Sequence, residues 1–164
     1  MIKEIKKSDI PECAAVIKDS FMTVAGAFGF TAENAPGFTA FVTNEEKILH
    51  WMNEQHRPMY GYFENGKLIG YYNLLVEENS ECELGSLCVL PGYRHSGIGK
   101  LLLNDALAKA EKLGCRVMKL SIVEENTVLR QWYEAQGFRH TGTQKFDFFP
   151  FTCGYMEKKI RSLE

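Results

Sequence analysis

The sequence predicts a mixed α/β (α+β) fold, built on a single twisted sheet of six to seven mostly antiparallel strands with about four helices on both faces. Strand-like and helix-like patterns follow one another in the order β-α-α-β-β-β-α-β-α-β-β. One strand–helix–strand crossover lies in the middle, and antiparallel pairs flank it, which favours a mixed sheet. The 164 residues fit one domain without linker or repeat, so residues 1–164 are assigned to a single domain.

The chain should begin with a short strand and a helix. Residues 2–6 alternate between apolar and charged side chains, as a strand does. Ser8 or Asp9 can then cap a helix, and Glu12 is placed to complete a capping box. The apolar spacing that follows predicts that this helix ends at about residue 24.

An unusual segment and a second helix come next. Residues 25–43 are rich in Gly, Ala and Phe and carry a single charge, Glu33. This composition indicates either an irregular or short-helical segment over a pocket or a poorly patterned core helix. Thr43 or Asn44 can cap the second helix, which should continue to about His56.

Three strands should follow in the middle of the chain. The first covers residues 59–63, and the turn pair Asn65-Gly66 predicts a hairpin with a second strand over residues 67–76. A polar turn then leads into a third strand over residues 82–90.

The last third of the chain should alternate between helices and strands. Apolar residues recur there at helical spacing: Gly99, Leu102, Leu103, Ala106, Leu107, Ala110 and Leu113. Gly114 should end this helix. A strand over residues 117–123, a helix over 126–136 and two strands over 138–146 and 151–158 complete the expected order.

Composition excludes several classes of protein. Residues 1–90 carry seven Lys and Arg against 13 Asp and Glu, whereas residues 91–164 carry 12 against eight. The acidic half suits a cationic ligand and the basic half a phosphate-bearing one, although a random partition of surface charge gives the same split. No basic–aromatic stripe and no apolar run of ~18 residues occurs, so we expect a cytoplasmic protein that binds neither nucleic acid nor membrane.

The cysteine and histidine spacings do not predict a metal site. The five cysteines are widely separated without a C-x-x-C pair, and the four histidines do not form H-E-x-x-H. We therefore expect reduced, mostly buried thiols and no metal cofactor.

The most informative segment is Pro-Gly-Tyr-Arg-His-Ser-Gly-Ile-Gly-Lys at residues 91–100, where a strand gives way to the long helix. The first N–H groups of a helix have no partner within it and carry partial positive charge. Glycine lets a phosphate approach such N–H groups closely. The segment therefore predicts a diphosphate site.

Two known phosphate-binding patterns fail here and a third fits. The segment is not a P-loop, because Leu101 stands where Ser or Thr is needed, and Leu102 replaces the last glycine of a dinucleotide fingerprint. The pattern [Q/R]-x-x-G-x-[G/A] is satisfied by Arg94, Gly97 and Gly99.

The surroundings of this loop carry a family resemblance. The run Leu-Cys-Val-x-Pro-x-Tyr-Arg-x-x-Gly-Ile-Gly-x-x-Leu-Leu over residues 87–103 resembles the coenzyme A-binding motif of the GNAT superfamily of N-acetyltransferases. Downstream, Asn126, Tyr133 and Gly137-Phe138 are similar to the N-x-x-A-x-x-x-Y-x-x-x-G-F segment of that family, with Leu129 in place of its alanine. The resemblance implies a GNAT-like fold and an acetyl-CoA-dependent N-acetyltransferase without metal.

The resemblance also implies where the coenzyme would bind. Backbone N–H groups of residues 95–100 would hold its pyrophosphate, and Arg94 and Lys100 would add positive charge. Residues 87–89 would pair with the pantetheine arm as an added strand, and an N–H at a bulge there would polarise the thioester carbonyl. The expected coenzyme-binding residues are Leu87, Cys88, Val89, Arg94, His95, Ser96, Gly97, Ile98, Gly99, Lys100, Asn126 and Tyr133.

Two residues are expected to carry the chemistry. Alkylamines are mostly protonated at neutral pH, and the resemblance places the required base at Glu83, acting directly or through water, with Glu81 on the same face. Both carboxylates could instead be solvated and attract a cationic acceptor. Tyr133 would protonate the departing thiolate or be a core aromatic. No neighbouring base activates Cys88, so we expect direct attack in a ternary complex rather than an acetyl-cysteine.

The acceptor is the least defined part. We expect a primary amine of a small molecule or peptide. One set of aromatic residues could form an amine pocket through cation–π contact or simply the core: Phe28, Phe30, Phe38, Phe41, Trp51, Phe146, Phe148, Phe149 and Phe151. The alternative function is a non-catalytic acyl-CoA-binding sensor or partner module on the same fold, against which Glu83 and Tyr133 argue. Exposed late strands are compatible with a homodimer.

Overall fold

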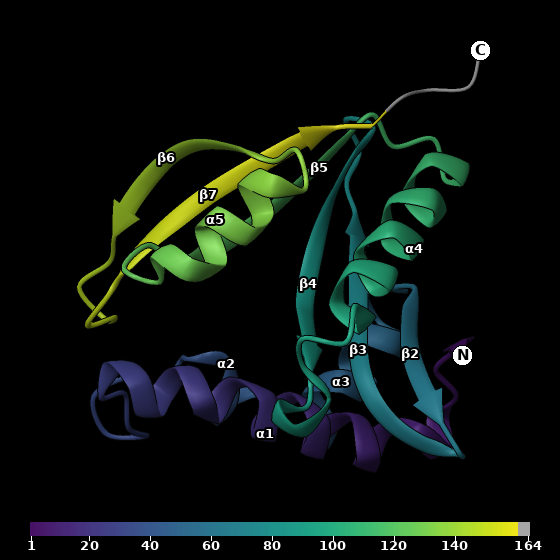
Figure 1. Ribbon diagram of the computed structural model, residues 1–164, viewed down its shortest axis with the longest axis horizontal. Helices are drawn as coiled ribbons and strands as arrows, with labels where there is room; N and C mark the ends of the chain where they lie inside the picture. The colour runs from purple at the N-terminus through teal and green to yellow at the C-terminus, as the bar shows by residue number, and fades with distance from the viewer. Residues whose placement is uncertain (161–164) are drawn as a thin grey trace.

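Seven strands form one sheet in the spatial order β1-β2-β3-β4-β5-β7-β6 in the computed structural model, which describes residues 1–160 (Figure 1). The strands are β1 (Ile2–Glu4), β2 (Met59–Glu64), β3 (Lys67–Val76), β4 (Glu81–Val89), β5 (Val117–Val123), β6 (Arg139–Lys145) and β7 (Thr152–Lys159). Neighbours are antiparallel except β4 and β5, which run parallel. The predicted mixed, mostly antiparallel sheet is confirmed.

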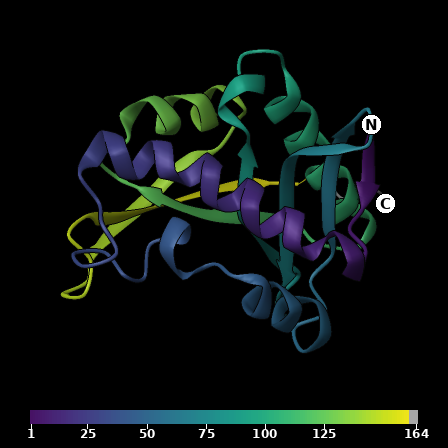
Figure 2. The same cartoon turned by 90° about the horizontal axis from the view of Figure 1, so that it is seen from below.

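Five α-helices cover the sheet, one more than expected. They are α1 (Ile10–Phe28), α2 (Thr39–Val42), α3 (Glu45–Asn53), α4 (Ile98–Lys112) and α5 (Thr127–Ala135), with short 3-10 turns at Lys7–Asp9 and Pro91–Tyr93. Figure 2 shows α1 across the middle of the molecule, with α4 and α5 towards one side and α2 and α3 towards the other. The additional helix is the single turn α2, which lies in the segment expected to be irregular or short-helical.

Local sequence signals set several element ends as predicted. Asn65 and Gly66 take positive φ values of 51° and 78°, as the tight turn of the β2–β3 hairpin requires. Asn44 caps α3 by accepting a hydrogen bond from Lys47 N at 2.8 Å. Gly114 follows α4 with φ 83°.

The start and the end of α1 differ from the prediction. Glu12 does not complete a capping box; its Oε2 accepts from Leu68 N on β3 at 2.8 Å, so it ties the helix to the sheet. Asp9 accepts from Lys6 N at 2.8 Å. The helix continues to Phe28, because Gly29 at φ 71° is the first residue that takes the left-handed conformation of a helix end.

Two cores lie on opposite faces of the sheet. On one face α4 and α5 pack over side chains such as Tyr72, Leu74 and Met118. On the other face α1 and α3 pack over Tyr71 and Cys88, among others. Because both faces are covered, residues that alternate along β4 point to different sides of the molecule. Within residues 1–160 no helix is long and apolar enough to cross a membrane.

Candidate functional site

The sheet opens between its two parallel strands. β4 and β5 pair only at their beginnings, through Glu81 with Val117, Cys82 with Met118, and Glu83 with Lys119. Figure 1 shows the two strands diverging from this paired end, with α1 across the open end. The rest of β4 therefore presents an unpaired backbone edge to the gap. Such an edge can pair with an extended amide chain, as expected for residues 87–89.

A β-bulge lies in this unpaired stretch of β4. Tyr71 of β3 pairs with Cys88 and Asn73 with Gly85, so the two residues Ser86 and Leu87 face Tyr72 alone. Ser86 has a positive φ of 50°, which for a non-glycine residue marks a locally constrained backbone. A bulge re-aims backbone N–H groups, which is the geometry the resemblance implies for polarising a thioester carbonyl.

The loop before α4 has the backbone of an anion site. His95 and Gly97 take positive φ values of 64° and 86°, the kind of turn in which successive N–H groups can converge on an anion. The first hydrogen bond of α4 is donated by Leu101 N to Gly97 O at 3.1 Å. The N–H groups of Ile98, Gly99 and Lys100 precede it and have no acceptor within the helix.

Gly99 is not required by the protein's own packing. A Cβ at this position would lie 3.7 Å from Trp132 and 3.9 Å from Val89, both ordinary contacts, and its φ is outside the left-handed region. A glycine within a helix destabilises it by about 0.5–1 kcal/mol relative to alanine. The space above Gly99 thus fits a ligand that approaches the backbone closely.

Arg94 ties the loop to two neighbouring elements through its guanidinium. Its Nε donates to Val89 O at 3.0 Å, its Nη1 to Thr23 Oγ1 at 3.0 Å and its Nη2 to Ser20 O at 2.8 Å. The guanidinium therefore joins the loop to the end of β4 and to α1. Its charge stays near the loop while its hydrogen bonds are made to protein groups, and both Arg94 and Lys100 are exposed.

The two candidate base residues have different surroundings. Glu81 forms an ion pair with Lys119 of β5. Glu83 is exposed and has no ion-pair partner within residues 1–160. The pKa of Glu83 is raised, chiefly because the surrounding strands partly remove its carboxylate from water. The positive charge of Arg57 opposes this rise, the negative charge of Glu77 adds to it, and the positive charge of Lys119 opposes it. The structure thus favours Glu83 over Glu81 as a free carboxylate.

A buried polar network supports the Glu83 side of β4. Asn73, which is fully buried, accepts from Arg57 Nη1 at 3.0 Å and donates to Tyr71 Oη at 3.2 Å. A Cβ on Gly85 would lie 2.3 Å from Asn73 Oδ1, so only glycine leaves room for this amide under the bulge. Arg57 also stacks over the Trp51 ring at 5.0 Å. Trp51 therefore holds a protein cation rather than lining an open amine pocket.

Tyr133 belongs to the core on the α4–α5 face of the sheet, opposite to Glu83. It is buried on α5 and packs edge-to-face on Trp132 at 5.0 Å and Phe138 at 5.4 Å. Within residues 1–160 its hydroxyl has no hydrogen-bond partner. Burial raises the pKa of Tyr133, and the nearby Cys88 thiol adds to the effect, so the phenol keeps its proton at neutral pH. Burial likewise raises the pKa of Cys88 to about 12, so its thiol is not a thiolate nucleophile.

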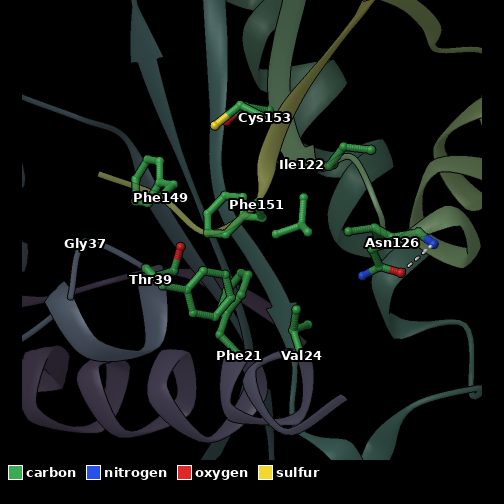
Figure 3. A pocket seen from close by; sticks show the side chains of 13 residues that line it. Phe21, Val24, Gly37, Thr39, Ile122, Asn126, Phe149, Phe151 and Cys153 are labelled. Atoms are coloured by element: carbon green, nitrogen blue, oxygen red, sulfur yellow. Dashed lines mark hydrogen bonds between the residues drawn. The ribbon is translucent and has the colours of Figure 1, made fainter. Parts of the chain in front are cut away.

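Asn126 lies where the gap meets a cavity of about 180 Å³. Its Oδ1 caps α5 by accepting from Leu129 N at 3.2 Å, and Figure 3 shows the remaining amide nitrogen on the cavity side. The cavity is lined by Phe21, Val24, Gly37, Phe38, Thr39, Ser121, Ile122, Val123, Asn126, Leu129, Phe149, Phe151 and Cys153. Its walls thus come from α1, the residues around the start of α2, the end of β5, the start of α5 and the chain entering β7.

The aromatic residues divide between core and cavity. Phe30, Phe38, Trp51 and Phe151 are buried, whereas Phe148 is 65% exposed. Phe38 and Phe151 also line the cavity, together with Phe149. The core interpretation therefore holds for the buried members of the set, and three of the phenylalanines line a cavity. All five cysteines are free, and within residues 1–160 no group of three or more His, Cys, Asp or Glu side chains could hold a metal ion.

Sequence reasoning missed three residues of the site. Trp132 borders Gly99, and Arg57 and Asn73 form the network beside Glu83. Asn73 could have been noticed, because it is the only amide side chain in the apolar strand over residues 67–76. Arg57 gave no such signal, since it stands in a polar stretch between a helix and a strand.

Comparison with known proteins assigns a family. The model of the Acetyltransferase (GNAT) family matches residues 28–138, which include Glu83, the loop before α4 and Tyr133. Spermidine N(1)-acetyltransferase of Thermoplasma acidophilum is 28% identical over 166 residues, covering 98% of both chains. The ribosomal protein bS18-alanine N-acetyltransferase of Haemophilus influenzae is 29% identical over 97 residues, covering 59% of this chain and 64% of that protein.

A solved structure shares the fold. PaiA N-acetyltransferase from Thermoplasma acidophilum, in complex with coenzyme A, matches with a TM-score of 0.82 at 23% identity, covering 97% of this chain and 98% of that one. The similarity extends over nearly the whole described chain, including both sides of the gap between β4 and β5.

Proposed function

The chain belongs to the GNAT family of acetyltransferases, and we propose that it moves the acetyl group of acetyl-CoA to a primary amine of a small molecule or peptide. The observation that carries the proposal is the unpaired, bulged edge of β4 beside the loop that precedes α4. A ligand with an extended amide arm that ends in a diphosphate needs a free strand edge for its amides and, next to it, a loop that binds its phosphates. The relatives named above differ in acceptor, so the family alone does not define the amine.

The residues present fit the coenzyme. Lys100 and the N–H groups of residues 95–100 would hold its pyrophosphate, and the space above Gly99 admits a close approach. Residues 87–89 offer an unpaired strand edge to the pantetheine amides, and the Asn126 amide nitrogen lies where the gap meets the cavity. When bound, acetyl-CoA supplies an acetyl thioester whose C–S bond breaks as the C–N bond to the amine forms.

Proton transfers are assigned to residues on the two faces of the sheet. Glu83 takes a proton from the substrate ammonium, directly or through water, because its raised pKa brings it closer to that of a useful base. Tyr133 gives its hydroxyl proton to the departing sulfur from the other face, and it regains a proton through solvent as the nitrogen releases its second proton on forming the amide. A backbone N–H at the bulge around Ser86 stabilises the negative charge that develops on the carbonyl oxygen.

Direct attack of the amine in a ternary complex is part of the proposal. Cys88 is the thiol nearest the bulge, but its pKa of about 12 keeps it protonated at neutral pH. Initial rates measured while both substrates are varied should therefore give intersecting lines. Parallel lines would indicate an acetyl-enzyme and contradict direct attack.

The proposal is tested by turnover with a panel of amines, amino acids and peptides. Coenzyme A should be separated by chromatography rather than detected with a thiol reagent, because the protein carries five cysteines of its own. We expect release of coenzyme A to match the acetylated amine detected by mass spectrometry. Tight coenzyme binding without turnover across all amine classes would instead support the non-catalytic acyl-CoA-binding module.

A further inference from the structure

The cavity described above can be assigned a chemistry. Among its 13 lining residues none is charged, and eight are apolar: Phe21, Val24, Phe38, Ile122, Val123, Leu129, Phe149 and Phe151. The aromatic part is closely packed, with Phe38 5.9 Å and Phe149 4.7 Å from Phe151 between ring centroids. Such walls favour an uncharged apolar group over an ammonium group.

Two carboxylates beside the cavity, Glu124 and Glu125, are engaged in the protein's own contacts. Glu124 pairs with Arg130 at 2.9 Å and contacts His140 Nε2 at 2.8 Å. Glu125 accepts from Thr152 N at 2.9 Å. These acidic groups serve the protein's own contacts, so the cavity offers no free carboxylate for the second charge of a diamine or polyamine.

Part of the cavity wall lies on the same face of the sheet as Glu83. Lys119 is the register partner of Glu83, so Ser121 and Val123 follow on that face at the two-residue period of a strand. Cys153 of β7 pairs with Val123 and shares the face. Ser121, the first of these cavity residues, is two residues from Lys119, or about 6.6 Å at roughly 3.3 Å per residue.

The volume of the cavity limits the size of the group that can bind in it. A cavity of about 150 Å³ with Leu, Ile and Phe walls holds a benzene molecule, and this cavity measures about 180 Å³. One aromatic ring, or a branched aliphatic group of similar volume, therefore fits. A short alkyl spacer would join such a group to the amine beside Glu83.

We infer that the acceptor is an apolar primary amine whose ring or branched aliphatic group enters this cavity while its amine faces Glu83. The inference rests on the proposed function and adds the class of acceptor to it. It differs from a cation–π pocket, because the ammonium stays at Glu83 and the uncharged end is buried. 2-Phenylethylamine is the simplest probe with this form.

A first test compares an aromatic amine with a diamine of similar length and with the truncated amine. The kcat/KM for 2-phenylethylamine should exceed that for 1,4-diaminobutane and for ethylamine by about 10- to 10²-fold, as expected from burying one ring. A kcat/KM for 1,4-diaminobutane that equals or exceeds the value for 2-phenylethylamine would overturn the inference and leave the proposed function intact. Failure of all amines would count against the proposed function itself.

A matched pair of variants on α1 tests the location. Val24 lines the cavity, whereas Met22 is 40% exposed and does not. Val24→Trp should bring the ratio of kcat/KM for 2-phenylethylamine over ethylamine close to one, and Met22→Trp should leave it unchanged. Both variants should keep the thermal shift caused by coenzyme A, which shows that they fold. An unchanged ratio in a folded Val24→Trp protein would overturn the assignment.

Cys153 provides a readout that does not depend on turnover. It lines the cavity and is the one cysteine that is only half-buried; the other four are buried. We expect 2-phenylethylamine to slow alkylation of Cys153 by a maleimide, followed by mass spectrometry, and 1,4-diaminobutane to have no effect. Protection by longer acyl-CoA thioesters but not by the apolar amine would assign the cavity to the acyl chain and overturn the inference.

Discussion

Replacing Gly99 by glutamate should abolish coenzyme binding and leave the fold intact. A side chain at this position meets only ordinary contacts, at 3.7 Å from Trp132 and 3.9 Å from Val89. A carboxylate in the first turn of a helix is favourable for the helix itself. The same carboxylate lies where the proposal puts the pyrophosphate, so both bulk and like charge exclude the ligand.

The size of the effect follows from binding linkage. At a concentration about 100 times its Kd, acetyl-CoA should stabilise the wild-type protein by about 2.7 kcal/mol. A domain of this size changes its Tm by roughly 2–4 °C per kcal/mol, so the coenzyme should raise the Tm by about 5–11 °C. Gly99→Glu should show no rise.

Thermal unfolding with and without coenzyme A measures this, supported by calorimetric titration. Gly99→Ala should keep the shift, because a methyl group fits and the loop pattern accepts alanine. Gly26→Glu should also keep it, because Gly26 is an exposed glycine of α1 with no atom within 4 Å of its Cβ position. A folded Gly99→Glu protein that retains the full shift would refute the assigned site.

Three further substitutions test the chemistry and the support of β4. Glu83→Gln should lower kcat/KM by roughly 10²-fold at neutral pH. The loss in kcat/KM should shrink at high pH, where the substrate amine is deprotonated without a base. An unchanged pH–rate profile would assign the base to another residue. Tyr133→Phe should lower kcat by about 10- to 10²-fold with little change in coenzyme Kd, whereas full activity would leave Tyr133 as a packing residue. Gly85→Ala should lower the free energy of unfolding by about 2–4 kcal/mol, measured with urea, because the added Cβ displaces the buried Asn73 amide. A variant as stable as the wild type would contradict this role of the glycine.

The pH dependence of stability gives an independent check on Glu83. Desolvation raises the pKa of this carboxyl in the folded protein. The folded state therefore binds the proton more tightly than the unfolded state, and the contribution of Glu83 to stability falls as pH rises from the unfolded to the folded pKa. Glu83→Gln removes this loss, so the variant should be more stable than wild type at neutral pH and should lose that advantage in acid. Equal stability at neutral pH would contradict a raised pKa.

Elements with strong local signals were predictable from the sequence. The hairpin at Asn65-Gly66, the helix after Gly97 and its end at Gly114 depend on backbone conformations that few residues adopt, so their sequence signature is direct. The irregular segment over a pocket was one of two interpretations of residues 25–43. The structure places Gly37, Phe38 and Thr39 of that segment in the cavity wall.

Features that depend on distant partners could not be predicted from local pattern. Arg94 matches its motif as a cation, but its hydrogen bonds go to α1 and β4, which only the folded chain brings near. Glu12 satisfied the spacing of a capping box and instead accepts from Leu68 N, 56 positions away. The difference between Glu81 and Glu83 likewise arises from Lys119 on the neighbouring strand.

Amide hydrogen exchange with and without coenzyme A tests the central claim most directly. If the coenzyme lies in the gap between β4 and β5, its binding should slow exchange at residues 87–89, at residues 95–100 and at the start of α5. The amides of β1 and β6, at the two edges of the sheet, should exchange at the same rate in both states. Protection confined to another surface, such as the open cavity lined by Met52, Arg57 and Tyr60, would contradict the account.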